Sequence, residues 1–435
     1  MGNGINQDYV LRCLECGAEI NGQWRIRCDC GGILELWRDL SGLDGERLQR
    51  LFEQRLFQER GTVYASGVWR YKELIAPELP ETALTTRGEG NTGLYLSQAC
   101  AAYAGIRELR LKAQSENPSG SFKDNGMVAA VSHGLSLGKN VFACSSTGNT
   151  SASLAMYAAW SGSTSLVIAP SSNISPAKIN QTTAYGAQVI RFDGTYDDGI
   201  VFLEKWGDAL GLYVCNSLNP YRIEGQKSIV YELAQQLQWK MPDWIAIPGG
   251  ALSNVSALGK GLADLWRLGM IDKLPRILLV QAEGASPFHR MVEQKGNMLV
   301  PEPYPHTRAS AMNIGNPPSW RKALAALELT GGVTAAVSDE EIMLAKRVID
   351  RSGIGCEPAS AATLAGLKKL KADGTIDKDE TAAAILTGHM LKDADALEEL
   401  YSGAIAHMPG GELLSPEVIR NALTFKSVRE YSKLI

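Results

Sequence analysis

The sequence predicts an α/β protein that has two parallel-sheet domains and a small N-terminal segment built around cysteines. Short apolar runs rich in β-forming residues recur from Glu108 onward, and a helical stretch follows each of them. The runs are nearly continuous rather than alternating, which is typical of strands buried on both faces of a parallel sheet. They are too numerous for one small sheet, so we expect two sheet domains. Four of the eight cysteines lie within residues 13–30, apart from this pattern.

Composition places the chain among ordinary globular proteins. Its 435 residues are enough for two or three domains, and its net charge of −4 gives no basic field to attract nucleic acid or a membrane surface. No apolar run approaches the roughly 20 residues that a membrane-spanning helix needs. The first residues lack the charged and apolar regions of a signal peptide. We therefore expect a cytoplasmic protein whose partners include neither nucleic acid nor membrane.

The N-terminal segment, residues 1–36, resembles a zinc ribbon. Cys13 and Cys16 are two residues apart in a C-x2-C pair, and Cys28 and Cys30 form a closer C-x-C pair. Four thiolates would suit a structural zinc ion with tetrahedral geometry. The alternative is four reduced thiols on a small β-hairpin without metal. The segment lacks a basic and aromatic patch, so a structural role is favoured over nucleic-acid binding.

The rest of the chain divides into three parts. Residues 37–99 include a charged helical stretch and are expected to pack on the large domain. Residues 100–215 are assigned to a small α/β domain and residues 216–435 to a large one. The predicted strands after residues 108–113 lie at 140–146, 164–170, 187–193, 212–217, 244–250, 276–284 and 382–388.

Three of these strands end in polar turns that contain glycine, at residues 145–150, 248–254 and 387–393. In open α/β sheets, ligands bind beyond the carboxyl ends of the strands. The second turn, PGGALSN, runs directly into a helical sequence. Glycines allow close backbone approach, and free N–H groups at a helix start favour an anion, so this turn is interpreted as a phosphate cup. A plain strand-to-helix turn is the alternative.

One lysine stands behind a flexible polar turn, in the sequence NPSGSFKDNGM at residues 117–127. Lysine forms Schiff bases with carbonyl groups. Pyridoxal phosphate carries an aldehyde, a phosphate and an electron-withdrawing ring. The lysine turn, the phosphate cup and the first polar turn therefore fit one site, in which Lys123 takes the aldehyde, the cup takes the phosphate and a side chain of the first turn takes the ring hydroxyl.

The same stretches resemble a known family. NPSGSFKDNGM, SSTGNTSAS, NSLNPYRIEGQK, ASAMNIGNPPSW, EPASAA and LTGHMLKD occur in order through nearly the whole chain. Together they resemble the threonine synthase family among the tryptophan-synthase-β-like, fold type II pyridoxal phosphate enzymes. The resemblance implies two parallel-sheet domains of that type, with the cofactor bound to the large domain.

The resemblance assigns the cofactor site residue by residue. It makes Lys123 the catalytic, Schiff-base lysine, gives Asn149 the ring hydroxyl and gives Thr387 the pyridine nitrogen. His389 lies in the TGHMLKD turn and is expected to line the cofactor wall. The phosphate cup comprises Gly250, Ala251, Leu252, Ser253 and Asn254. The chain departs from the family pattern at Gly93, Asn125, Ala251 and Ser253, which leaves the exact substrate open.

The family's substrate is O-phospho-L-homoserine, which water converts to L-threonine and phosphate. The resemblance implies that Ser146, Thr147 and Thr150 hold the substrate carboxylate, and that Asn216, Ser217 and Arg222 recognise its phosphate. Arginine suits phosphate because its planar guanidinium donates two parallel hydrogen bonds. We expect a carbon–oxygen lyase that assembles as a homodimer.

Two alternatives stay open at this point. A serine/threonine dehydratase or a β-replacing synthase would keep the cofactor site, but would have no use for the phosphate-recognising residues. A non-catalytic binding protein built on the zinc ribbon would lack the cofactor and its absorbance.

Overall fold

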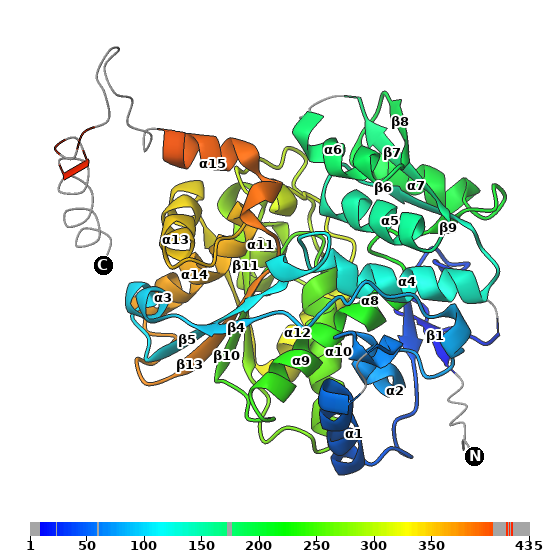
Figure 1. Cartoon of the computed structure of the whole chain (residues 1–435), viewed down its shortest axis with the longest axis horizontal. Coiled ribbons are helices and arrows are strands. Elements are labelled where there is room, and N and C mark those ends of the chain that lie inside the picture. Colours follow the sequence, from blue (N-terminus) through cyan, green and yellow to red (C-terminus); the bar gives the residue numbers. More distant parts are fainter. Residues whose placement is uncertain are drawn as a thin grey trace.

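A computed structural model shows three sheets linked by helices (Figure 1). It describes residues 9–22, 24–58, 61–171 and 176–402, together with residues 415, 417, 419 and 420. The arrangement confirms the predicted α/β fold with parallel sheets. Within the described residues, no helix is long and apolar enough to cross a membrane.

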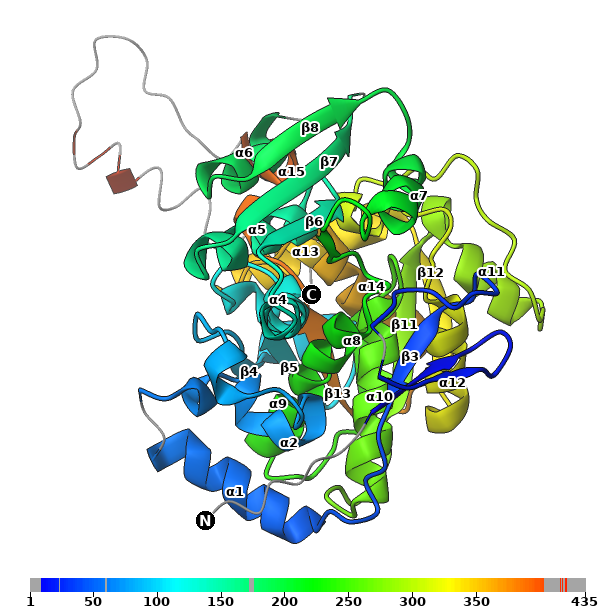
Figure 2. The ribbon, with the colours of Figure 1, turned by 90° about the vertical axis from the view of Figure 1, so that its right-hand side faces the viewer.

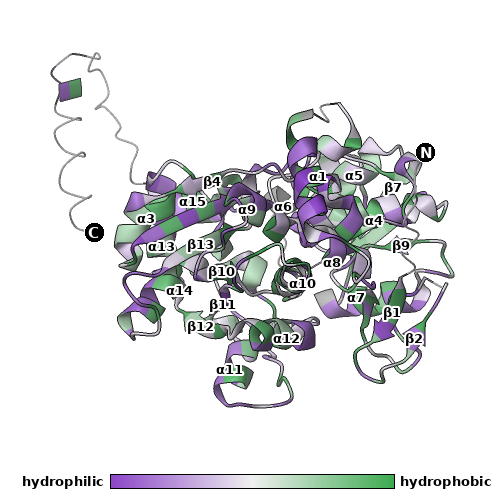
Figure 3. Ribbon diagram, turned by 90° about the horizontal axis from the view of Figure 1, so that it is seen from below, coloured by the Kyte–Doolittle hydropathy of each residue, from purple (hydrophilic) through white to green (hydrophobic). Residues whose placement is uncertain are grey.

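The N-terminal sheet is small and antiparallel. Its order is β2-β1-β3, formed by β1 (Val10–Cys13), β2 (Glu19–Ile20) and β3 (Leu34–Trp37). Leu11, Leu34 and Leu36 are fully buried and join the main core of the molecule. The charged stretch forms α1 (Gly45–Gln58), which Figure 3 shows mostly in the hydrophilic colour. The short helix α2 (Lys72–Ile75) follows.

The second sheet has four parallel strands in the order β8-β7-β6-β9. They are β6 (Val141–Ser145), β7 (Thr164–Pro170), β8 (Gln188–Phe192) and β9 (Tyr213–Val214). The accompanying helices are α4 (Lys123–Ser136), α5 (Asn149–Trp160), α6 (Pro176–Ala184) and α7 (Tyr196–Trp206).

The third sheet has six strands in the order β12-β11-β10-β13-β5-β4, all parallel except the edge strand β4. The strands are β4 (Leu94–Leu96), β5 (Glu108–Ala113), β10 (Trp244–Pro248), β11 (Arg276–Ala282), β12 (Val333–Val337) and β13 (Thr381–Leu386). Its helices are α3 (Gln98–Ala104), α8 (Pro220–Gln226), α9 (Ser228–Gln236), α10 (Ser253–Arg267), α11 (Pro287–Glu293), α12 (Trp320–Thr330), α13 (Asp339–Arg351), α14 (Pro358–Ala372) and α15 (Ala394–Tyr401).

Sheet membership differs from the predicted division at one point. The segment from residue 100 was assigned to the small domain, but β5 pairs with β13 in the six-stranded sheet. The chain therefore enters the four-stranded sheet only at β6. The sequence does not reveal this, because neighbouring strands of a parallel sheet come from distant parts of the chain. Strand β12 was also missed, since its VTAAV sequence is short and only partly buried.

Helices α4 and α8 lie in close contact, and two glycines permit it. A Cβ atom on Gly225 would lie 2.2 Å from the carbonyl oxygen of Asn125, and one on Gly126 would lie 2.7 Å from that of Arg222. Any larger residue would push the two backbones apart. This packing holds the start of α4, where Lys123 lies, next to α8, which carries Arg222.

Candidate active site

The Lys123 turn is joined by its backbone to the carboxyl end of β13. The N–H of Phe122 donates to the carbonyl of Thr387 at 2.9 Å, and the N–H of His389 donates to that of Gly120 at 2.9 Å. Ser121 and Gly388 form a β-bridge between these two bonds. Lys123 is therefore fixed beside Thr387, although 264 positions separate them in the sequence (387 − 123).

Asp124 fixes the same turn from the other side. Its carboxylate accepts hydrogen bonds from the N–H and hydroxyl of Ser119 at 2.7 and 2.6 Å, and from the hydroxyl of Ser153 at 2.5 Å. Burial raises the pKa of Asp124 to about 6, against the effect of these donors. The residue after the lysine thus ties the turn to α5, so Lys123 starts α4 from a rigid base.

Lys123 is arranged to lose its proton in the neutral pH range. Burial lowers the pKa of its amine to about 7, and the positive charge of Arg222 adds to the effect while Glu357 opposes it. A buried amine of this kind is a nucleophile and a proton acceptor, which an ordinary lysine is not. The charge of Arg222 is thus close enough to act on this amine, while its contact with substrate phosphate stays a prediction.

Glu357 joins the two residues that were assigned to the cofactor ring. Its carboxylate accepts hydrogen bonds from Nδ2 of Asn149 at 2.9 Å and from Oγ1 of Thr387 at 3.0 Å. Thr387 also lies 2.9 Å from the hydroxyl of Ser360. Asn149 comes from the four-stranded sheet's domain and Thr387 from the six-stranded sheet, so Glu357 holds the two halves of the site together. Burial raises the pKa of this carboxyl.

The predicted phosphate cup lies at the start of α10. Leu252 immediately precedes the helix and has a φ of +66°, which turns the backbone sharply into it. The first N–H groups of a helix have no intrahelical acceptor, and α10 begins at Ser253. A Cβ on Gly250 would lie 2.9 Å from the carbonyl of Ala311, so only glycine fits beneath that loop. The side chain of Leu252 is buried in the core, which leaves only its backbone for an anion.

These residues fit pyridoxal phosphate. Two buried polar atoms, Oγ of Ser121 and Nδ2 of Asn254, have no hydrogen-bond partner among the described residues. Both belong to the segments assigned to the cofactor. An uncharged buried lysine, a helix start with free N–H groups and unused donors together match an aldehyde that carries a phosphate. Lys123 would hold the aldehyde carbon and residues 250–254 would hold the phosphate.

The substrate residues divide into two groups. Ser146, Thr147 and Thr150 lie where β6 ends and α5 begins, as expected for a carboxylate-binding turn. Asn216 serves this turn indirectly, because its amide exchanges hydrogen bonds of 3.1 and 3.0 Å with the backbone of Ser145. Its direct contact with substrate stays a prediction.

Ser217 and Arg222 lie deeper in the molecule. Oγ of Ser217 is buried and has no partner in the part of the chain that the structure describes. Arg222 is fully buried and donates to the carbonyl of Cys215 at 3.1 Å. A phosphate that reached this guanidinium would be removed from water, where a charge-assisted hydrogen bond is strong.

Sequence reasoning missed two residues of this site. Glu357 was quoted within EPASAA without a role, although a glutamate just before the helix-starting Pro358 was a visible signal. Lys392 follows the Thr387 turn and forms a hydrogen bond with Gln181 of α6. Gln181 also donates to the carbonyl of Ser119 at 3.0 Å. The turn after β13 is thus bonded to the domain that carries α6.

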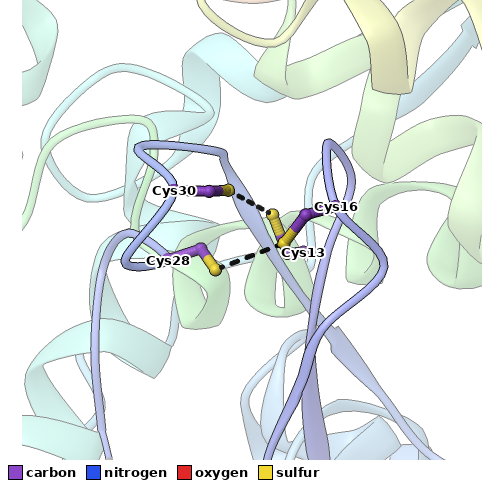
Figure 4. A group of neighbouring side chains, drawn as sticks. All are labelled: Cys13, Cys16, Cys28 and Cys30. Carbon is purple, nitrogen blue, oxygen red and sulfur yellow. Dashed lines mark hydrogen bonds between the residues drawn. The ribbon is translucent and has the colours of Figure 1, made fainter.

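The four clustered cysteines come together as the spacing predicted (Figure 4). The sulfurs of Cys13, Cys16, Cys28 and Cys30 all lie within 4.8 Å of one another. Cys13 and Cys30 are 3.5 Å apart, and Cys16 and Cys28 are 3.7 Å apart. Zn–S bonds of about 2.3 Å in a tetrahedron place sulfurs about 3.8 Å apart, so the cluster has the size of a zinc site.

The chain matches the family described as "Pyridoxal-phosphate dependent enzyme" over residues 68–388. It is 41% identical to the threonine synthase of Methanocaldococcus jannaschii over 389 residues, which cover 89% of this chain and 94% of that protein. It is 40% identical to the threonine synthase of Mycobacterium tuberculosis over 72% of this chain and 85% of that protein.

Solved structures show the same fold. The threonine synthase of Escherichia coli superposes with a TM-score of 0.70 over 92% of this chain and 93% of that chain, at 18% identity. A maize serine racemase superposes with a TM-score of 0.62 over 78% of this chain and 98% of that chain, at 19% identity. Likenesses at this level of identity concern the fold alone.

The fold and the lysine site define a pyridoxal-phosphate dependent enzyme of the fold type II class. Within that class the chain belongs to the threonine synthase family, because the two relatives quoted above match most of their length and most of this chain. This confirms the resemblance that the motifs suggested.

The pKa of Lys123 predicts how the apoenzyme takes up its cofactor. Because the amine is neutral above a pKa of about 7, we expect covalent capture of pyridoxal phosphate to rise through pH 7 and to level off above it. Arg222→Gln removes a neighbouring positive charge and should move the midpoint to higher pH. The measurement is the growth of absorbance near roughly 410 nm after mixing, as a function of pH.

Lys123→Ala is the control for this experiment. It should leave the fold intact and give no cofactor attached to protein after borohydride reduction, and it should abolish turnover. A wild-type midpoint near about 10, the usual value for lysine, would contradict the arrangement described for Lys123.

Proposed function

We propose that this protein is a threonine synthase that converts O-phospho-L-homoserine and water to L-threonine and phosphate. The observation that carries the proposal is the 41% identity to the archaeal threonine synthase across 94% of that protein's length. The packing supports it, since the fully buried Arg222 lies on α8, which packs closely against α4, the helix that begins at Lys123. An enzyme whose amino-acid substrate has an uncharged side chain would not need that guanidinium.

The residues of this chain would divide the chemistry as follows. When bound, pyridoxal phosphate withdraws electrons from the attached amino acid and so makes its Cα and Cβ protons acidic. The neutral amine of Lys123 would accept the Cα proton and a Cβ proton, and would return protons to Cγ and Cα. Overall, phosphate leaves Cγ, which becomes a methyl group, while water adds its hydroxyl at Cβ and its proton goes to the released phosphate. Arg222 would hold the phosphate throughout, and Ser217 would donate its unused hydroxyl to it.

Thr387 favours elimination and replacement over transamination. It is the residue assigned to the ring nitrogen, and it offers a neutral hydroxyl that is already bonded to Glu357 and Ser360. A hydroxyl does not hold the ring nitrogen protonated as a carboxylate in that position would. The nearby Glu357 is occupied by its bonds to Asn149 and Thr387.

An assay of phosphate release tests the function. Wild-type holoenzyme should release equal amounts of phosphate and threonine from O-phospho-L-homoserine, and Lys123→Ala should release neither. Serine and threonine are assayed in parallel for deamination, which is the activity of the dehydratase alternative. Rapid deamination with no phosphate release would favour that alternative and overturn the proposal.

Arg222→Ala separates the phosphate role from a structural one. The loss of one charge-assisted hydrogen bond to phosphate costs roughly 1.5–3 kcal/mol. This corresponds to a loss of about 10- to 150-fold in kcat/KM for the phosphorylated substrate. Slow deamination of serine and the cofactor absorbance should change little when each enzyme is measured on the upper plateau of its cofactor-capture curve, where Lys123 is neutral with or without the charge of Arg222. Equal losses on both substrates would assign Arg222 to the fold instead.

We also propose that the cysteine cluster holds one structural zinc ion. Two observations support this proposal: the spacing of the four sulfurs, and the opposite shifts in the pKa of two of the thiols. Burial would raise the pKa of Cys13, but hydrogen bonds from the backbone of Cys16 and Glu15 lower it to about 7. The Gly32 N–H lowers the pKa of Cys30, yet the sulfurs of Cys16 and Cys13 raise it to about 12. Four thiols this close ionise together only beside a cation.

We also propose that the protein is a homodimer in the cytoplasm, where its thiols would stay reduced.

Metal analysis of freshly purified, reduced protein should find about one zinc per chain. Removing it with a chelator should first destabilise the N-terminal segment, which is measured as earlier proteolysis within residues 9–38. The catalytic rate should fall only after this cleavage has begun. Normally folded, fully reduced protein that contains no metal would contradict the assignment.

A further inference from the structure

Helix α8 presents two different faces to its surroundings. Arg222 bonds the carbonyl of Cys215, just after β9, at 3.1 Å, and its charge acts on Lys123. Tyr221 and Glu224 are three residues apart and so share another face of the helix. Both are buried, and both contact the N-terminal part of the chain. The N-terminal part of the chain therefore packs against the face of α8 that does not carry Arg222.

Glu224 is the centre of that attachment. Its carboxylate lies 2.6 Å from the amine of Lys260, 2.7 Å from that of Lys227 and 2.9 Å from the guanidinium of Arg38. The side chain is fully buried. Burial alone would raise the pKa of Glu224, but the three cations lower it to about 2. The carboxylate is thus ionised and fixed in place at any working pH.

Arg38 brings the N-terminal segment to this carboxylate. It directly follows β3 in the cysteine segment, which we define as residues 9–38. Its guanidinium donates to both oxygens of Glu78 at 3.1 and 2.7 Å, and to Glu224 at 2.9 Å. Glu78 also accepts from the hydroxyl of Tyr221 at 2.5 Å. Figure 2 shows β3 beside α8 and α10.

Aromatic rings extend the same contact. Trp24 of the cysteine segment lies 5.5 Å from the ring of Tyr221, and Tyr9 lies 6.0 Å from it in an edge-to-face arrangement. Tyr221 is the residue next to Arg222. The cysteine segment therefore contacts both Tyr221 and Glu224, the two residues on the face of α8 that does not carry Arg222.

Helix α10 belongs to the same network. Lys260 lies on α10, seven positions after the helix starts at the phosphate cup, and also bonds the carbonyl of Leu36 in β3. Lys227 links Glu224 to Asp264 of α10 at 2.8 Å and to the carbonyl of Leu74 at 2.7 Å. The network thus connects β3, the helix that carries Arg222 and the helix that begins at the cup.

We propose that Arg38 and Glu224 are positioning residues of the substrate site, which hold α8 so that Arg222 stays aligned with the substrate phosphate. The proposal rests on the role proposed above for Arg222. A buried ion network adds little to stability, because desolvation offsets its attraction. It does fix geometry, since Arg38, Lys227 and Lys260 each have a defined partner in the fully buried Glu224. The cysteine segment would then support the active site without touching substrate.

The chain offers a matched control. Two further ion pairs attach the cysteine segment elsewhere, Arg27 to Glu204 of α7 at 2.8 Å and Glu15 to Arg321 of α12 at 2.7 Å. Neither reaches α8. Arg27→Gln therefore removes an arginine–glutamate contact from the same segment while leaving Arg38, Glu224 and Arg222 untouched.

The experiment compares holoenzyme carrying Arg38→Gln with wild type and with Arg27→Gln. Inorganic phosphate is the probe, and its affinity is measured from the rise in melting temperature with phosphate concentration. Arg38→Gln should weaken phosphate affinity by about tenfold, which is about 1.4 kcal/mol, and raise KM for O-phospho-L-homoserine similarly. Serine deamination and cofactor absorbance should stay near wild type. Arg27→Gln should change none of these.

Arg38→Lys is the second variant, in case Arg38→Gln folds poorly. Lysine keeps the positive charge. Its single amine cannot bond both oxygens of Glu78 and also Glu224, as the guanidinium of Arg38 does, so we expect an intermediate loss of phosphate affinity. Unchanged affinity in both Arg38 variants, or equal losses on phosphate and serine, would overturn the proposal. So would a loss in Arg27→Gln equal to that in Arg38→Gln, or a wild type that does not bind phosphate. Wild type that binds phosphate but does not convert O-phospho-L-homoserine would refute the proposed function alone.

Discussion

The site depends on the backbone bonds that join the Lys123 turn to the carboxyl end of β13. The pairs Phe122 with Thr387 and His389 with Gly120 bring two distant segments into one short antiparallel contact. Strand β13 lies between β10 and β5, so the turn inherits the rigidity of a central strand. Glu357 bonds both Thr387 and Asn149, which brings the Asn149 turn to the same end of β13. The lysine needs no flexibility of its own to meet a ligand.

Charge and burial then set the chemistry. The charges of Arg222 and Glu357 act on Lys123; these two residues are buried, and Lys123 is partly buried. Burial acts against every charge, so the amine gives up its proton most easily, while Arg222 stays charged. The site therefore combines a neutral nucleophile with a fixed cation. This combination suits a substrate that brings a negative charge to one end and reacts at the other.

The N-terminal segment belongs to the same construction. Its leucines enter the main core, and Arg38 enters the ion network around Glu224. Three ion pairs attach it to α7, α8 and α12, so it contacts both sheet domains. The four clustered cysteines lie in this segment as well. The segment is thereby connected to the helices on either side of the active site.

The sequence alone determined the chemistry that depends on local order. Apolar runs predicted the strands, and glycine-rich turns at their ends predicted where a ligand binds. The motif around Lys123 predicted the cofactor, and the cysteine spacing predicted a cluster that the structure brings together. Each of these is a property of neighbouring residues, which a sequence displays directly.

Only the tertiary structure decided the rest. It placed β5 in the large sheet, set Glu357 between Asn149 and Thr387, and brought Arg38 to Glu224 across 186 positions. Such contacts depend on how sheets and helices pack, and no local pattern in the sequence encodes the partner of a buried charge.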